Sequence, residues 1–258
     1  MPFADNEGVR IHYETEGGGP PLVLQHWSVA TLENWYDFGY VSALKNEYRL
    51  ILLDARGHGA SDKPQTPEEY KLKKRVEDIV AVLDNLGIAK AHYFGYSMGG
   101  WIGFGLARYA PERLRSLIIG GATPHPTSMN GLRQFIRVAI EKGPNSFVAQ
   151  WEEEFGVVPP ALRKRMLAYD YKTLLVLAQD RENLESVLPT MSMPCLLFSG
   201  EMDELSVEAC ARQIANSTFF TLPGLDHGGA ITRCDEVLPH VKKFLMEVDQ
   251  LNQTWKQS

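Results

Sequence analysis

The sequence has few cysteines, no long apolar run and no signal peptide, and each absence excludes a class of protein. Its three cysteines, Cys195, Cys210 and Cys234, are odd in number and have no metal-ligand or redox spacing. We therefore expect free thiols in a reducing compartment. No stretch approaches the roughly 18 apolar residues of a membrane span. The N-terminus lacks the basic start and apolar stretch of a secretory signal, so we expect a cytoplasmic protein without a membrane partner.

The charge of the chain argues against a nucleic-acid partner. The formal net charge is −6, and the densest basic run, residues 71–75, is followed at once by Glu77 and Asp78. We interpret this run as a solvated helix start, because a nucleic-acid site needs a basic face. No H-E-x-x-H motif or Cys/His cluster predicts a metal, and no glycine-rich loop predicts a nucleotide, so no cofactor is expected.

Strand-like and helical patterns alternate along most of the 258 residues, a length that suits one substantial core. Short apolar or alternating runs predict strands at residues 3–4, 9–14, 22–24, 50–53, 92–94, 117–119, 195–198 and 219–222. Helices are expected at residues 76–86, 98–109 and 235–251. The alternation predicts an α/β fold, in which helices flank a mostly parallel sheet of about eight strands.

The pattern changes between residues 123 and 190. Strand-like runs vanish there, and helical segments are punctuated by prolines, among them Gly143-Pro144 and Pro159-Pro160. Because proline starts or stops helices, we expect a small helical cap inserted into the core. The predicted organisation is a first core part at residues 1–122, the cap at 123–190 and a second core part at 191–258.

The most informative stretch is Gly95-Tyr96-Ser97-Met98-Gly99. It places G-x-S-x-G directly after a predicted strand and before a predicted helix, the context in which this motif carries a nucleophilic serine. The two glycines leave room around a sharp turn because they lack side chains. The turn lifts the Ser97 hydroxyl above the sheet edge and aims the free N–H groups of the next helix at the reacting oxygen. We therefore predict Ser97 as the nucleophile.

A second segment, Asp54-Ala55-Arg56-Gly57-His58-Gly59-Ala60-Ser61, is similar to the D-x-R-G-x-G-x-S stretch of capped α/β-hydrolases. With both motifs, the sequence resembles the α/β-hydrolase superfamily over essentially its whole length, and in particular capped serine hydrolases such as carboxylesterases and enol-lactonases. The resemblance implies that the second segment is scaffold rather than chemistry. It also implies a catalytic triad in the chain order Ser, acid, His.

The segments after the last two predicted strands supply the other members of the implied triad. The stretch after residues 195–198 resembles the family's G-x-x-D, which points to Asp203 as the acid, with Glu201 and Glu204 as competitors. His227 lies in the loop between the last strand and the last helix, where the resemblance places the general base. Asp203 would then hold the imidazole tautomer while His227 takes the proton of the nucleophile.

Two backbone N–H groups are expected to stabilise the tetrahedral oxyanion. One belongs to Met98, directly after the nucleophile, and the resemblance gives the other to the loop after the third predicted strand. Aligned on that strand, Trp27 is the donor, and Gln25-His26 stand where relatives commonly carry His-Gly. The missing glycine restricts the loop backbone. If His26 instead occupies the family's histidine position, Ser28 becomes the donor.

A triad of this kind performs acyl transfer, so we predict an enzyme that cleaves a small-molecule carboxylic ester or lactone. A dehalogenase or epoxide hydrolase of this fold would resemble a form of the family that has Asp as its nucleophile. Ser97 therefore argues against both activities. Two alternatives stay open. Carbon–carbon bond hydrolases of vinylogous diketones share the Ser-Met-Gly-Gly stretch, and some relatives are low-turnover receptors for small molecules. A monomer or a homodimer is expected.

The cap is expected to shape the substrate pocket. The candidate walls are apolar or aromatic side chains near the nucleophile and in the cap: Trp27, Tyr96, Met98, Phe135, Trp151 and Phe155. Of these, the predicted substrate-binding residues are Tyr96, Phe135 and Trp151. The cap also carries basic residues that either steer an anionic substrate or form a solvated surface: Arg133, Arg137, Arg163, Lys164 and Arg165.

Overall fold

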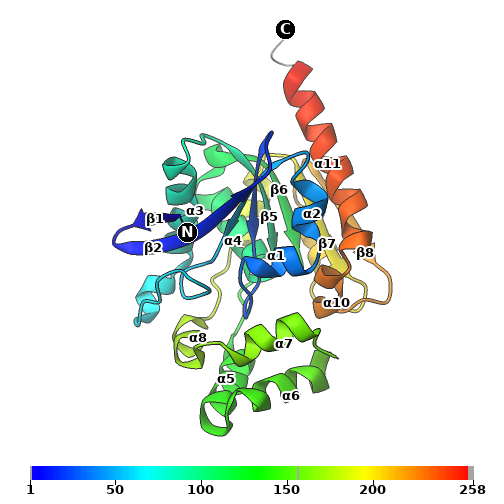
Figure 1. The fold of residues 1–258 in the computed structure, drawn as a ribbon. Coiled ribbons are helices and arrows are strands. Elements are labelled where there is room, and N and C mark those ends of the chain that lie inside the picture. Colours follow the sequence, from blue (N-terminus) through cyan, green and yellow to red (C-terminus); the bar gives the residue numbers. More distant parts are fainter. Residues whose placement is uncertain (1, 156, 255–258) are drawn as a thin grey trace.

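The computed structural model describes residues 2–155 and 157–254, and at its centre is one eight-stranded sheet (Figure 1). The strand order is β1-β2-β4-β3-β5-β6-β7-β8. The pairs β1–β2 and β2–β4 are antiparallel, and all other neighbours are parallel. The predicted α/β fold is confirmed. The strands are β1 (Phe3–Asn6), β2 (Val9–Glu16), β3 (Pro21–Gln25), β4 (Arg49–Leu53), β5 (Ala91–Tyr96), β6 (Leu114–Gly120), β7 (Cys195–Gly200) and β8 (Ser217–Leu222).

The central strands are buried on both faces, which explains their continuous apolar runs. Leu22 of β3 pairs in register with Leu50 of β4 and with His92 of β5, and all three side chains are buried. The His92 imidazole is satisfied in this setting, because Nδ1 lies 2.7 Å from Ser116 Oγ and Nε2 lies 3.1 Å from Asp249 Oδ1.

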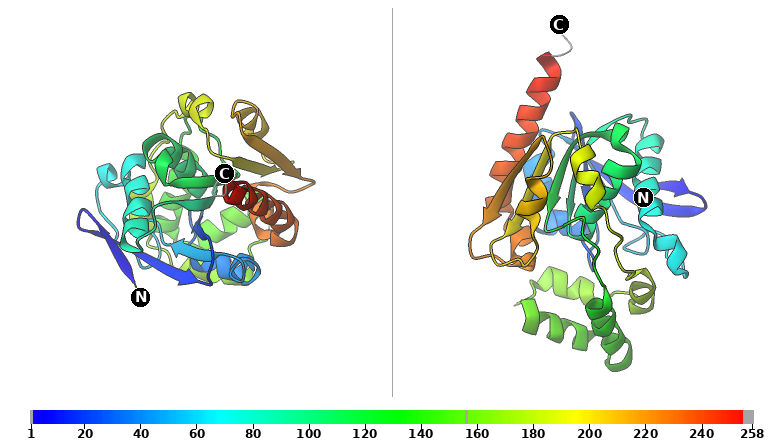
Figure 2. Two further views of the ribbon diagram at one scale, coloured as in Figure 1. Left: turned by 90° about the horizontal axis from the view of Figure 1, so that it is seen from above. Right: turned by 180° about the vertical axis from the view of Figure 1, so that it is seen from behind.

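Helices cover both faces of the sheet (Figure 2). One face is covered by α3 (Leu72–Asn85), α4 (Met98–Tyr109) and α9 (Val207–Ala211). The other face is covered by α1 (Glu33–Asp37), α2 (Tyr40–Leu44), α10 (His227–Thr232) and α11 (Cys234–Thr254). The helices α1, α2, α9 and α10 are each only five or six residues long, too short for helical spacing to be visible in the sequence.

Four helices between β6 and β7 lie together at one end of the sheet (Figures 1 and 2). They are α5 (Asn130–Lys142), α6 (Pro144–Phe155), α7 (Pro160–Leu167) and α8 (Tyr171–Leu177). Pro144 and Pro160 are the first residues of their helices, where a missing N–H costs nothing. These helices share an apolar cluster of their own, which we call the cap cluster; it includes Ile136, Phe147 and Leu174.

Three short 3₁₀ helices complete the fold: η1 (Pro67–Tyr70), η2 (Pro111–Arg113) and η3 (Glu185–Thr190). Val187 and Leu188 of η3 pack in the core beneath α4, although they lie inside the predicted cap range. In the described residues, no helix is long and apolar enough to cross a membrane. The same part of the chain holds no group of three or more His, Cys, Asp or Glu side chains placed to bind a metal ion.

Candidate active site

The predicted catalytic residues follow parallel strands at one edge of the sheet. Trp27 comes after β3, Ser97 after β5, Asp203 after β7 and His227 after β8. The carboxyl ends of parallel strands meet at the same edge, which is where α/β proteins bind ligands. The cap lies over this edge, because Trp151 of α6 lines the same cavity as Ser97.

Ser97 occupies a strained turn between β5 and α4. Its φ of 50° and ψ of −107° are unusual for a residue with a side chain, and its N–H donates to Gly120 O at 2.8 Å. The flanking glycines are needed for close approach. A Cβ on Gly95 would lie 2.3 Å from Gly99 O, and one on Gly99 would lie 2.2 Å from Gln25 O. The turn is therefore packed directly against the loop after β3.

The acid nearest the imidazole of His227 is Asp203. His227 Nδ1 lies 2.8 Å from Asp203 Oδ2, and the carboxylate is 5% exposed. The two competing acids lie elsewhere, because Glu201 accepts the N–H of Gly224 at 2.8 Å and Glu204 is exposed. With Nδ1–H donated to a carboxylate, Nε2 of the neutral ring is left as a proton acceptor.

Tyr96 fixes the backbone of the His227 loop. Its hydroxyl donates to His227 O at 2.6 Å, and the two rings lie 5.4 Å apart. Burial raises the pKa of this phenol well above its ordinary value, so it stays a neutral donor. Tyr96 lines the cavity, as expected of a substrate-binding residue, but its polar atom is committed to the protein backbone.

His26 holds the loop after β3 in place by two hydrogen bonds. Its Nε2 accepts the Ala55 N–H at 3.0 Å, so Nδ1 carries the proton and donates to Trp27 O at 2.7 Å. Burial lowers the pKa of the ring, which keeps it neutral. Within the described residues, the N–H groups of Trp27, Ser28 and Met98 donate to no protein acceptor. No protein acceptor in this part of the chain therefore competes for these three N–H groups.

A cavity of about 190 Å³, which we call the nucleophile cavity, contains Ser97 and His227 in its lining. Its other lining residues are mostly apolar or aromatic: Trp27, Ser28, Phe38, Tyr96, Trp151, Val157, Val158, Pro159, Leu162, Asp226, Gly228, Gly229, Ile231 and Thr232. Trp27 stacks on Phe38 with ring centroids 5.6 Å apart. The cavity is thus a small apolar chamber with a hydroxyl and an imidazole in its wall.

The predicted pocket walls divide into four groups. Trp27, Tyr96 and Trp151 line the nucleophile cavity. Phe135 is absent from the lining given by the described residues and packs against the cap cluster. The side chain of Phe155 lies outside the described residues. Met98 faces a second cavity, described below.

Sequence reasoning missed several residues of the nucleophile cavity. Phe38, Leu162 and Ile231 come from three different helices or helix ends, and only the tertiary structure brings them together. The one local signal was Pro159-Pro160, which marks the bend between α6 and α7 and places Pro159 in the lining.

The Asp54 segment holds loops together rather than facing a substrate. Asp54 Oδ1 accepts the Leu32 N–H at 2.9 Å, and Oδ2 accepts the Ala60 N–H at 2.9 Å and lies 2.8 Å from His12 Nδ1. Asp54 is buried and is absent from the lining of the nucleophile cavity given by the described residues. These contacts agree with the scaffold role implied by the sequence.

Comparisons with known proteins identify the fold family of the chain. The model of the alpha/beta hydrolase fold family matches residues 20–153. The chain is 32% identical, over 88% of its length, to the dihydrolipoyllysine-residue acetyltransferase component of an acetoin cleaving system from Pseudomonas putida, of which the match covers 64%. It is 37% identical, over 45% of its length, to a cis-3-alkyl-4-alkyloxetan-2-one decarboxylase from Shewanella oneidensis, of which the match covers 37%. In both cases the chain matches less than two thirds of the relative's length.

Among solved structures, the chain resembles the enol-lactonase from Burkholderia xenovorans LB400. The two share a TM-score of 0.82 and 26% sequence identity, over 95% of this chain and 100% of the other.

Proposed function

Because the chain belongs to the α/β-hydrolase family, we propose that it is a serine hydrolase that cleaves a small carboxylic ester or lactone through an acyl-enzyme on Ser97. The observation that carries the proposal is the 2.8 Å hydrogen bond between His227 and Asp203, beside the cavity that Ser97 and His227 both line. A serine hydroxyl is a weak nucleophile without an adjacent, oriented base. The likeness to an enol-lactonase supports the choice of an ester or lactone carbonyl.

In the acylation step, Ser97 Oγ attacks the carbonyl carbon of the substrate and its proton passes to Nε2 of His227. Asp203 holds the imidazole by Nδ1–H and stabilises the imidazolium that forms. The bond from the carbonyl carbon to the leaving oxygen then breaks, and that oxygen takes the proton from His227. In a lactone the leaving oxygen stays tethered to the acyl group, so the ring opens.

In the deacylation step, water attacks the acyl-enzyme, gives its proton to His227, and releases the acid as Ser97 regains a hydrogen. The N–H of Met98 and that of Trp27 or Ser28 stabilise the oxyanion in both steps. Such donors contribute most when they are fixed before the reaction. The hydrogen bond from His26 to Trp27 O helps to fix the loop that carries Trp27 and Ser28.

The size of the nucleophile cavity limits the substrate. Its volume of about 190 Å³ is below the range of about 300–1,000 Å³ typical of drug-sized ligand sites. Its wall is mostly apolar, so an acyl group that fits gains contact area with Trp27, Phe38 and Trp151. We therefore expect short to medium acyl chains or small lactones, and poor activity on triglycerides.

The test is a chain-length series of p-nitrophenyl esters, assayed beside simple lactones and a vinylogous diketone. We expect kcat/KM to peak at a short or medium chain and to fall by about tenfold or more for long chains, since poorly fitting methylenes lose transition-state contacts. Efficient cleavage of the diketone with negligible ester turnover would favour carbon–carbon hydrolysis instead. Saturable binding without turnover of any substrate would favour a receptor.

A further inference from the structure

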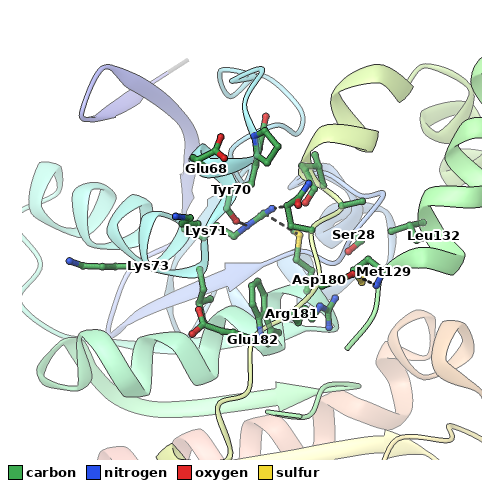
Figure 3. A pocket seen from close by; sticks show the side chains of 18 of the residues that line it. Ser28, Glu68, Tyr70, Lys71, Lys73, Met129, Leu132, Asp180, Arg181 and Glu182 are labelled. Atoms are coloured by element: carbon green, nitrogen blue, oxygen red, sulfur yellow. Dashed lines mark hydrogen bonds between the residues drawn. The ribbon is translucent and has the colours of Figure 1, made fainter. Parts of the chain in front are cut away.

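A second cavity, of about 480 Å³, lies between the cap and the core next to the proposed oxyanion donors. Ser28 lines both cavities, and Met98, the neighbour of Ser97, lines the second one. In Figure 3 the labelled side chains come from four segments: the loop after β3, η1 with the start of α3, the start of the cap, and the segment after α8. We call this space the arginine cavity, after Arg75 and Arg181 in its lining.

Arg75 is a buried cation without a carboxylate partner in the described part of the chain. Its side chain is held by Tyr70 O at 2.9 Å and Leu177 O at 3.2 Å, and it lies 3.6 Å from Met98 Sδ. The residue is only 4% exposed. Its interpretation as part of a solvated helix start is therefore wrong, because Leu72, Arg75, Val76 and Ile79 share the buried face of α3.

Arg181 reaches the same cavity from the segment after α8. Its guanidinium carbon lies 5.5 Å from the ring centroid of Trp101, and no carboxylate among the described residues lies within ion-pair distance of it. Burial lowers the pKa of Arg75 and of Arg181 to about 10, and the charge of Arg181 contributes to the shift at Arg75. Both guanidiniums remain charged at neutral pH, because pKa values of about 10 lie well above it.

Trp101 is 6% exposed and lines the same cavity, where its ring lies against the guanidinium of Arg181. Its indole N–H has no hydrogen-bond partner among the described residues, but this nitrogen is buried and does not open into the cavity.

The carboxylates around the arginine cavity do not neutralise these cations. Asp180 pairs with Arg133 at 2.9 Å and Glu182 pairs with Arg108 at 3.6 Å, while Glu68 is exposed. Several arginines of the cap helices, unlike Arg75 and Arg181, form ion pairs with acidic side chains. Three of them are matched by acids: Arg133 by Asp180, Arg163 by Glu152, and Arg165 by Glu33 and Asp37.

We propose that the arginine cavity is an anion-binding subsite, in which Arg75 and Arg181 receive a carboxylate or phosphate group carried by the substrate. The proposal rests on the proposed function, since it places the scissile carbonyl of that substrate at Ser97. Guanidinium groups suit planar oxyanions because they donate two parallel hydrogen bonds. The substrate class is therefore an ester or lactone with an anionic arm, rather than a wholly apolar ester.

The kinetic test compares ethyl monoesters of dicarboxylic acids with neutral ethyl esters of equal chain length, with acid release followed by pH-stat. We expect the wild type to favour at least one carboxylated ester over its neutral match by about tenfold, the usual worth of a hydrogen bond to a charged group. In Arg181→Met this preference falls by about tenfold, and in Arg181→Lys it falls less. The ratio within one preparation cancels any loss of folded protein.

The matched control is Arg137→Met, which removes the same charge from an exposed position on α5. It should leave the preference within about twofold of the wild type. A preference for neutral esters at every chain length, or an equal loss of preference in Arg137→Met and Arg181→Met, would overturn the subsite.

A binding measurement separates this proposal from the proposed function. Isothermal titration with adipate and with inorganic phosphate should show binding to the wild type that weakens about tenfold in Arg181→Met but not in Arg137→Met. If adipate binds the wild type more tightly than phosphate does, the anionic group of the substrate is assigned as a carboxylate. If phosphate binds more tightly, it is assigned as a phosphate group. Equal affinity in the wild type and Arg181→Met overturns the subsite. If adipate or phosphate binds as expected but no ester or lactone is turned over, the subsite stands and only the hydrolase proposal is contradicted.

Discussion

Replacing Ser97 by alanine is expected to lower kcat on a short-chain ester by about 10⁶-fold, as removal of a triad nucleophile does elsewhere. The substitution removes the only atom that can form the acyl-enzyme. It should leave the fold in place, because the turn is held by the Ser97 N–H to Gly120 O and by the Trp101 N–H to Ser97 O, which alanine keeps. The measurement is kcat on the best p-nitrophenyl ester, with circular dichroism to verify folding.

The matched control for this variant is Ser42→Ala, an exposed serine on α2 whose hydroxyl donates only to Gly39 O. It should retain wild-type kcat within about twofold, as surface substitutions away from a site usually do. Activity of Ser97→Ala within tenfold of the wild type would mean that another group attacks the substrate.

Replacing Asp203 by asparagine is expected to lower kcat by about 10⁴-fold, the cost seen when a triad acid becomes an amide. Asparagine has nearly the same shape, but its amide N–H₂ group favours the wrong imidazole tautomer and cannot stabilise the imidazolium. Because Asp203 is 2.8 Å from His227 Nδ1, this change acts directly on the base. The measurement is kcat at neutral pH.

Two neighbouring acids provide the controls for Asp203. Glu201→Gln and Glu204→Gln remove the same charge from side chains that do not reach His227, and each should cost less than about tenfold. If Glu204→Gln lowers kcat by about 10⁴-fold and Asp203→Asn does not, the acid has been assigned to the wrong residue.

Local sequence patterns were sufficient to predict the sheet and the position of the nucleophilic turn. Continuous apolar runs mark strands that are buried on both faces, and G-x-S-x-G between a strand and a helix marks a turn whose glycines are required sterically. The acid was harder to choose, since Glu201, Asp203 and Glu204 are close in sequence. Only the structure shows which carboxylate lies beside His227.

Features that depend on cap–core contacts could not be predicted. Phe38 lines the nucleophile cavity from the end of α1, a helix too short to give a periodic signal. Arg75 belongs to a basic run that is typical of a solvated helix, yet its side chain is buried between Leu177 of the cap and Met98 of the core. Helical spacing places Arg75 on the same face as Leu72, Val76 and Ile79, but it does not show which other elements cover that face.

The most direct test of the acyl-enzyme mechanism is covalent labelling of the folded protein with a fluorophosphonate, read by intact-protein and peptide mass spectrometry. We expect one phosphonyl group per chain, located on Ser97, because only a serine activated by an adjacent base attacks the probe rapidly. The Ser97→Ala variant should take up none. Labelling at a different residue, or no labelling of the folded wild type, would contradict the assignment of Ser97 as the nucleophile.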